Sequence, residues 1–316
     1  MDDFPRLQKG MKFMASDKRT QTNREELVDI LRQKCTQEGA NPIQTGLNFY
    51  RHTAPSDPLH GLYSPSICII AQGAKEVQMG SEKFRYDPNH FLLCSLDVPV
   101  VSQVVQATRE KPFLGLKLDL DPATISSVSI EAGIAPTKTE SSVPSIAVSE
   151  LEGELLDAFV RLFRLVNSPA DYNMISPMVT KEIVYRLLKS EQGQRLLQMA
   201  SFGGNTHRIA RAIQTLQSKF SEALSIEDLA HELGMSVSSF HQHFKAATSM
   251  SPLQFQKSLR LQEARNLLLT EDLDASSVAA RVGYDDASQF SREYKRHFGN
   301  PPIRDIARLK EYSAVK

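Results

Sequence analysis

The chain has 316 residues, and its 37 basic and 37 acidic side chains give a formal net charge of zero. At about 100–200 residues per domain, this length predicts two domains, and an apolar content of 41% is enough for a substantial core. No apolar run approaches the roughly 18 residues of a membrane span, and the N-terminus has no apolar region typical of a secretory signal. We therefore expect a cytoplasmic protein with no membrane partner.

The cysteines and the charge distribution exclude further classes. Cys35, Cys68 and Cys94 are far apart and form no C-x-x-C motif, which argues against a disulfide framework and a structural zinc site. Residues 205–316 contain 15 Lys and Arg and 13 Asp and Glu, a balance of +2. That positive excess is too small to indicate a nucleic-acid partner by itself. The positions of the charges therefore have to show whether the protein binds nucleic acid.

The N-terminal half has the pattern of a β-rich domain. Residues 1–20 are polar and are predicted to be a flexible arm. Short β-rich runs follow from Leu47 to Leu120, including "SPSICIIAQG" at 64–73 and "KEVQMGSEKFRY" at 75–86. The second run predicts a hairpin that turns at Gly80-Ser81. Many short strands at such intervals predict a sandwich or small barrel over residues 21–150.

The pattern changes to helix after residue 150. Apolar residues in 151–200 recur at steps of three and four, which predicts amphipathic helices. These helices either pack on the barrel or pair two subunits, and the sequence does not choose between the two. The small and polar "SFGGNT" at 201–206 is the predicted linker, and residues 207–316 form a second, helical domain.

Two stretches of that second domain interrupt a helical pattern with a glycine at the same phase. They are "LAHELGMSVSSFHQHFK" at 229–245 and "VAARVGYDDASQFSREYK" at 278–295. Gly234 can adopt a positive φ, and Gly283 takes its place at an offset of 49. Phe240 and Phe290 correspond at an offset of 50. This pattern predicts two helix-turn-helix units.

The residues between the two units predict a rigid spacer. "PLQFQKSLRLQEARNLLL" at 252–269 is typical of a single helix, about 27 Å long at 1.5 Å per residue. Successive major-groove faces of B-DNA are roughly 34 Å apart. The spacing therefore favours a double-stranded DNA operator as the partner.

Residues 208–308 resemble the DNA-binding domain of the AraC/XylS family of bacterial transcription regulators, most specifically in "GYDDASQFSREYKRHFGNPP". The N-terminal half is similar to the cupin-like effector domains of that family. The resemblance implies an α+β multidomain chain, with an N-terminal cupin-like β-barrel, flanking helices and an all-α C-terminal domain containing two helix-turn-helix units. It also implies a small-molecule effector and a homodimer.

The family's base-facing positions fall on Ser238, His241, Gln242, Ala287, Ser288, Ser291 and Arg292. A glutamine suits the edge of adenine, and an arginine can bond O6 and N7 of guanine together. Lys245, Lys295 and Arg296 are expected to contact phosphates. The alternative is a solvated helix face, on which Glu293 and Asp286 offset the basic cluster.

The effector candidates are Arg51, His60, Cys68 and Cys94. Both cysteines lie in apolar runs, where they are either small buried hydrophobes or electrophile-sensing thiols. Two rival interpretations remain: a ligand-independent regulator whose barrel only dimerises, and a metal-dependent cupin-type enzyme. Single histidines such as His60 and the incomplete "HELGM" do not supply a metal set, so we expect no metal, cofactor or catalysis.

Overall fold

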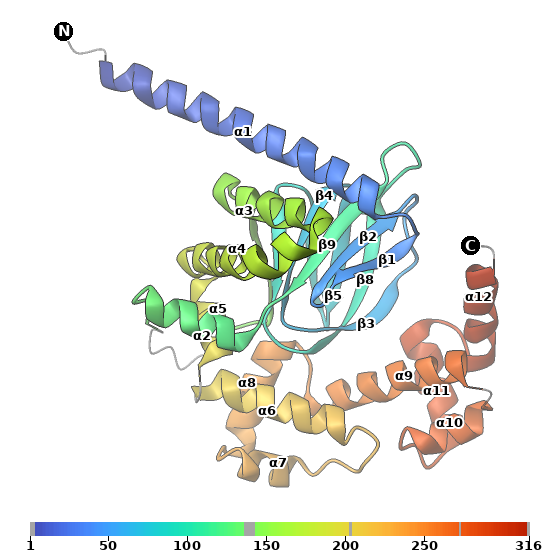
Figure 1. Cartoon of the computed structure of the whole chain (residues 1–316). Coiled ribbons are helices and arrows are strands. Elements are labelled where there is room, and N and C mark those ends of the chain that lie inside the picture. The colour runs from blue at the N-terminus through green and yellow to red at the C-terminus, as the bar shows by residue number, and fades with distance from the viewer. Residues whose placement is uncertain (1–3, 136–142, 202–203, 272, 315–316) are drawn as a thin grey trace. The chain divides into compact units, whose positions relative to one another are not determined.

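The computed structural model describes residues 4–135, 143–201, 204–271 and 273–314. The chain divides into two compact units, Met1–His207 and Arg208–Lys316 (Figure 1). Residues 202–203 of the expected linker lie outside the described residues, and helix α6 already begins at Gly204.

The described residues of the N-terminal unit form ten strands in two antiparallel sheets. The six-stranded sheet has the order β1 (Gly39–Gln44), β2 (Leu47–His52), β9 (Phe113–Asp119), β4 (Ser66–Gln72), β7 (His90–Cys94) and β10 (Ile146–Glu150). The four-stranded sheet has the order β3 (Leu59–Tyr63), β8 (Val98–Gln106), β5 (Ala74–Met79) and β6 (Glu82–Tyr86). Met79 pairs with Glu82, which confirms the hairpin at Gly80-Ser81. The predicted barrel thus takes the form of a two-sheet sandwich that is not closed.

Helices cover one face of the six-stranded sheet. They are α1 (Phe4–Lys34), α2 (Pro122–Glu131), α3 (Gly153–Arg164), α4 (Pro169–Lys189) and α5 (Gly193–Ala200), with a 3₁₀ turn at Leu165–Asn167. Phe49 of β2 meets Phe163 of α3 edge to face, with ring centroids 5.4 Å apart. Pro169 is tolerated because it occupies the first turn of α4, where its missing N–H would have no helical partner.

The N-terminal segment differs from the expected flexible arm, because residues 4–20 belong to α1. Leu27 and Leu31 lie four residues apart and are buried, so their packing anchors the helix. Asn23 donates to Asp157 of α3 at 3.1 Å, and Arg164 of α3 is paired with Glu26 at 2.6 Å. Once a helix is nucleated by such contacts, extending it towards the N-terminus costs little.

Helices are the regular elements in the described residues of the C-terminal unit, and the first of them begins at Gly204, just before the boundary of the unit. They are α6 (Gly204–Ser218), α7 (Ile226–Glu232), α8 (Val237–Thr248), α9 (Pro252–Thr270), α10 (Ala275–Arg281), α11 (Ala287–Phe298) and α12 (Pro302–Ala314). The pairs α7–α8 and α10–α11 confirm the two predicted helix-turn-helix units. The side chain of Ser236 accepts from the backbone N–H of Ser239 at the start of α8, and Asp286 accepts from Ser288 at the start of α11.

Candidate nucleic-acid interface and sandwich pocket

The two turns have the same backbone geometry. Gly234 has φ +63° and Gly283 has φ +89°, a region that costs other residues strain. In the first turn, Met235 donates its backbone N–H to the carbonyl of Ala230 at 2.9 Å. In the second, Tyr284 donates to Ala279 at the same distance. Both bonds satisfy carbonyls left open at the helix end, so each turn is a stable, repeated element.

Aromatic residues determine which face of each second helix is exposed. Phe240 and Phe244 of α8 are fully buried, and so are Phe290 and Tyr294 of α11. Residues four apart share one helix face, so the opposite face of each helix is left to solvent. α8 and α11 therefore present equivalent polar faces.

The predicted DNA-contacting residues lie on these polar faces. Seven are exposed and three are partly exposed. The exposed residues are Ser238, Gln242, Lys245, Ser288, Arg292, Lys295 and Arg296, and the partly exposed ones are His241, Ala287 and Ser291.

α11 carries a basic cluster of Arg292, Lys295 and Arg296. The acidic residues near the helix leave most of this cluster without a counterion. Glu293 accepts from Lys257 of α9 at 2.8 Å and from the Tyr284 hydroxyl at 2.9 Å, and Arg296 is 4.0 Å from it. Asp286 caps the helix instead of pairing with a cation. Among the described residues, the side chains of Arg292 and Lys295 form no ion pair. Their charges are thus available to a ligand.

Arg260 of α9, which no sequence pattern singled out, joins the segment between α6 and α7 to the second turn. Its guanidinium donates to the carbonyls of Phe220 at 2.7 Å and Glu222 at 2.8 Å, both in the segment between α6 and α7. It also donates to the carbonyl of Gly283 at 2.6 Å, in the second turn. A Cβ at residue 283 would collide with the carbonyl oxygen of Ser221, so the second turn lies directly against the segment between α6 and α7. No local pattern marks Arg260, because each partner is more than twenty residues away.

A pocket of about 270 Å³ lies between the two sheets of the N-terminal unit. The six-stranded sheet contributes Tyr50, Cys68 and Phe113, among others, and the four-stranded sheet contributes Tyr63, Lys75 and Tyr86. Burial raises the pKa of Tyr50 to about 12 and also raises that of Tyr86, so both hydroxyls keep their protons. The pocket is therefore aromatic, with hydroxyl donors on its wall.

Lys75 carries the charge of this pocket. Its amine lies 5.7 Å from the ring centre of Tyr50 and 5.6 Å from that of Tyr63. Burial disfavours its charged form, but the oxygens of Tyr63 and Tyr50 and the Cys68 thiol outweigh this, and the pKa of Lys75 lies above its usual value. The ammonium is thus held by rings and neutral polar groups.

Only one of the four predicted effector residues lines the pocket. Cys68 faces it, and burial raises the pKa of its thiol. Arg51 and His60 each follow a pocket residue in their strands and face the other way, because side chains alternate along a strand. Cys94 is fully buried, and its thiol donates to the carbonyl of Leu96 at 3.1 Å. Burial also raises its pKa, so its thiolate is disfavoured.

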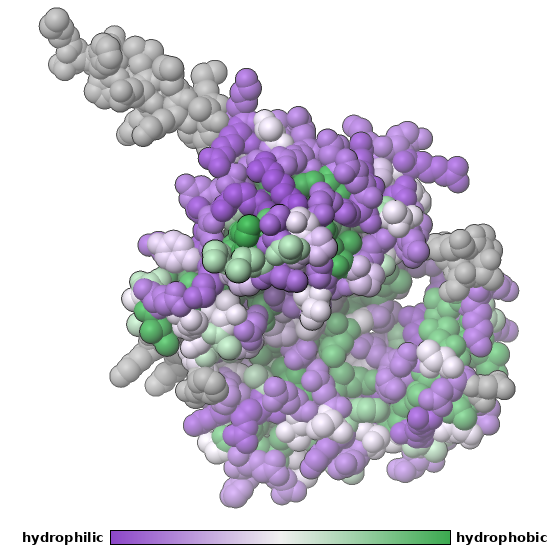
Figure 2. All heavy atoms as spheres, in the orientation of Figure 1, coloured by the Kyte–Doolittle hydropathy of each residue, from purple (hydrophilic) through white to green (hydrophobic). Residues whose placement is uncertain are grey.

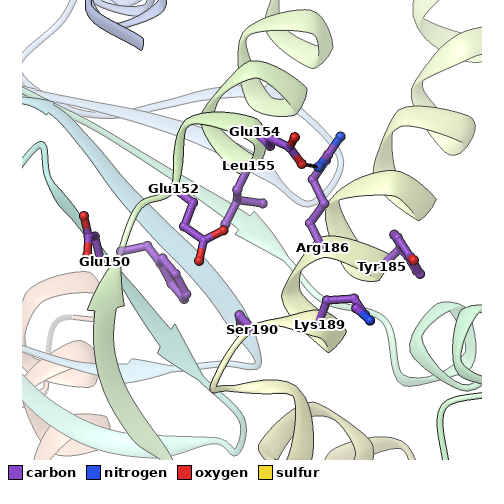
Figure 3. Close-up of a pocket in the computed structure, with 9 residues that line it drawn as sticks. Glu150, Glu152, Glu154, Leu155, Tyr185, Arg186, Lys189 and Ser190 are labelled. Atoms are coloured by element: carbon purple, nitrogen blue, oxygen red, sulfur yellow. Dashed lines mark hydrogen bonds and ion pairs between the residues drawn. The ribbon is translucent and has the colours of Figure 1, made fainter. Parts of the chain in front are cut away.

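A second cleft, of about 250 Å³, lies where the start of α3 meets the end of α4. Figure 3 shows Glu152 and Glu154 on one side and Arg186 and Lys189 on the other. Arg186 pairs with Glu154 and, at 2.8 Å, with Glu182. These contacts fasten α3 to α4, and the cleft contains none of the residues predicted from the sequence.

Two further possibilities are a metal site and a membrane-spanning helix, and the described residues contain neither. His90 pairs with Asp87 at 2.8 Å, and His52 is 4.0 Å from Glu38. Within the described ranges, no three His, Cys, Asp or Glu side chains gather where they could hold a metal ion. No helix of the described part is both long and apolar enough to cross a membrane.

Comparison with known families matches both units. Residues 44–195 match the AraC-type transcriptional regulator N-terminus, and residues 229–307 match a helix-turn-helix domain.

Curated relatives match over about a third of the chain. The raffinose operon transcriptional regulatory protein RafR of Pediococcus pentosaceus is 35% identical over 98 residues, 31% of this chain and 35% of the relative. The HTH-type transcriptional activator RhaS of Citrobacter koseri is 31% identical over 108 residues, 34% of this chain and 38% of the relative. The match thus spans little more than a third of each relative's own length.

A solved structure is similar over most of the chain. ToxT from Vibrio cholerae aligns with a TM-score of 0.52 and 12% identity, covering 82% of this chain and 97% of ToxT. At that identity the likeness concerns the fold.

Proposed function

The chain belongs to the AraC family of transcription regulators, and we propose that it is a sequence-specific DNA-binding regulator controlled by a small molecule. The observation that carries this proposal is the repeated turn, which leaves two equivalent polar helix faces exposed. A helix of this kind fits the major groove, where its side chains can reach base edges. A regulator of chromosomal DNA in a bacterium works in the cytoplasm.

The proposed contacts divide into two groups. The base-facing group is Ser238, His241, Gln242, Ala287, Ser288, Ser291 and Arg292. Lys245, Lys295 and Arg296 bind phosphates, which fix the register of the protein on the duplex. Arg260 contacts no DNA in this proposal. It holds the segment before α7 against the second turn, so that α8 and α11, the two reading helices of this proposal, keep a constant spacing.

The test is to map the DNA bound by the tagged full-length protein across its genome. We expect discrete sites with two sequence elements about one helical turn apart, because two linked helices would enter successive major grooves. A titration of one such site against a scrambled duplex then gives the specificity. Equal affinity for both duplexes would contradict the proposal.

The sandwich pocket is the proposed effector site. It is a partly open pocket with a charged group and hydroxyl donors, as expected of a site that orients a small molecule. Bound effector would have to favour one arrangement of the chain over another to change transcription. The favoured arrangement, and whether it activates or represses, depends on the operator.

We also propose a homodimer formed through α4. At 100° per residue, Met174, Met178 and Tyr185 fall within about 40° of one another, whereas Ile183 lies about 180° from Met174. Ile183 is fully buried, but Met174 and Met178 are 71% and 65% exposed. Figure 2 shows apolar side chains among polar ones over α3 and α4. The buried face serves packing, and the exposed stripe remains for a second copy.

Sedimentation of the Met178→Glu variant tests the dimer. A charge in the centre of the stripe should shift the full chain towards the monomer, whereas Glu191→Lys, away from the stripe, should not. An unchanged sedimentation coefficient for Met178→Glu would remove α4 from the interface.

A further inference from the structure

The interior of the sandwich contains a cation without a counterion. Lys75 of β5 points into the pocket. In the register of the two antiparallel strands it lies opposite Tyr86 of β6. Among the described residues, no carboxylate forms an ion pair with Lys75. An ammonium removed from water is held here by aromatic rings and neutral polar groups, so a bound anion would add the charged partner that the free pocket does not supply.

The other lysine of the pocket is in a different situation. Lys117 of β9 pairs with Asp119 at 2.9 Å and donates to the Ser64 hydroxyl at 2.8 Å. Its charge is therefore satisfied within the protein. Of the described residues that line the pocket, Lys75 is the one whose positive charge no carboxylate pairs with.

The walls around Lys75 are flat and apolar. Tyr50 and Tyr63 present their ring faces to its amine, and Leu59 and Phe113 extend the apolar surface. Phe113 lies over the backbone of Gly115, where a Cβ would stand 2.8 Å from the ring. The missing side chain lets the ring lie flat and form one wall of the pocket.

The volume limits the size of an occupant. A 150 Å³ apolar cavity in another protein holds benzene, so about 270 Å³ suits a molecule of roughly twice that size. The aromatic walls favour an unsaturated or aromatic body. The Tyr63 side chain is hydrogen-bonded to the Lys75 amine, so its hydroxyl lies where it can also donate to an acceptor placed beside Lys75.

We propose that this pocket binds a small unsaturated organic acid, with its carboxylate on Lys75 and its flat body against Tyr50, Tyr63 and Phe113. The inference rests on the proposed function, since it names the class of effector for that same site. A carboxylate supplies the missing negative charge, and a neutral polyol of equal size would leave the ammonium uncompensated.

Calorimetric titration of the full-length protein tests this assignment. The probes are benzoate, trans-cinnamate and 1-naphthoate, each paired with its neutral amide. We expect at least one acid to bind at least tenfold more tightly than its amide. Lys75→Met should abolish that preference, and Lys75→Arg should restore most of it. Lys83→Met removes an exposed lysine of the adjacent strand β6 and should behave like the wild type.

Three results would overturn the assignment: no binding of any acid at millimolar concentration, equal affinity for acid and amide, or unchanged acid affinity in Lys75→Met. The same samples are titrated with a mapped DNA site. If DNA binding persists while the acids fail, only the ligand class is wrong. If the acids bind but the DNA does not, the regulatory proposal fails and the pocket assignment stands.

Discussion

The two helix-turn-helix units have the same backbone conformation at their turns but differ in the contacts that stabilise them. In the first unit Phe244 meets Phe255 of the next helix edge to face, at 5.4 Å. At the matching positions, 50 residues later, the Tyr294 hydroxyl donates to Asp305 at 3.0 Å. Asp305 is fully buried and is also paired with Arg265 at 2.8 Å. An apolar contact in one unit is thus replaced by a buried charged network in the other.

The two turns also differ in how closely other atoms pack against their glycines. A Cβ at Gly234 would meet open space, so only its positive φ requires glycine. Gly283 has both a positive φ and the Ser221 carbonyl against it, and its own carbonyl accepts from Arg260. A repeated pattern can therefore preserve backbone conformation and core phase while the surrounding chemistry diverges. Both units have an apolar core, and the second unit adds buried polar and close contacts at positions where the first has apolar packing or open space.

Breaking the charged network should have the largest effect. Asp305→Ala leaves Arg265 buried without its partner, which we expect to destabilise the second unit by about 3–5 kcal/mol. Hydrogen exchange of the full chain should show faster exchange in α11 and α12 than in α8. Asp285→Ala, at an exposed position nearby, is the control. Equal acceleration in both units would argue against this difference between them.

Alanine in place of each glycine should distinguish the cost of backbone strain at a positive φ from the cost of a collision between the new Cβ and a neighbouring atom. We expect Gly234→Ala to cost about 1–2 kcal/mol, from the left-handed conformation alone. Gly283→Ala should cost about 2–4 kcal/mol, because the new Cβ also displaces the Ser221 carbonyl. The two free energies of unfolding, from urea denaturation, test this order. Similar costs would mean that the contact at Ser221 is easily relieved.

Mild acid should weaken the second unit selectively. Burial, with the charges of Arg265 and Arg296, lowers the pKa of His297 to about 4. Between about pH 6.5 and 4 the unfolded chain takes up a proton at this residue that the folded chain does not, so stability falls as the pH falls through this window. We expect a loss of about 2 kcal/mol, allowing for partial exposure. His297→Gln should flatten this dependence, and an identical pH profile for the variant would contradict it.

The reading helices should also differ in their contribution to DNA binding. Arg292→Ala should lower affinity for a mapped site by about 1–3 kcal/mol and relax the preference at one base pair. Gln242→Ala should cost less, since a neutral side chain makes weaker hydrogen bonds. Lys295→Ala should weaken all duplexes alike and flatten the salt dependence. Anisotropy titrations at several salt concentrations distinguish these effects; unchanged affinity in both Arg292→Ala and Lys295→Ala would exclude the assignment.

Local signals account for the parts that sequence predicted well. The glycine turns and the four-residue spacing of Phe240 and Phe244 act within one or two helical turns, so their outcome hardly depends on the rest of the chain. The residues that line the sandwich pocket were harder to predict, because a side chain reaches the pocket only if its strand register points it inward. Arg51 and His60 do not line this pocket, because they alternate with the strand residues that do. The helix over residues 4–20 was missed because contacts with α3 anchor it.

The order of residues along the chain was sufficient to determine two domains of different secondary structure, a duplicated helix-turn-helix and the exposed face of each reading helix. Only the tertiary structure decided that Lys75 lies without an ion-paired carboxylate inside the sandwich, among the described residues, and that Arg260 links the segment between α6 and α7 to the second turn. Such features arise between segments far apart in sequence. Their energy depends on burial and on neighbouring atoms, and neither is encoded in a local pattern of residues.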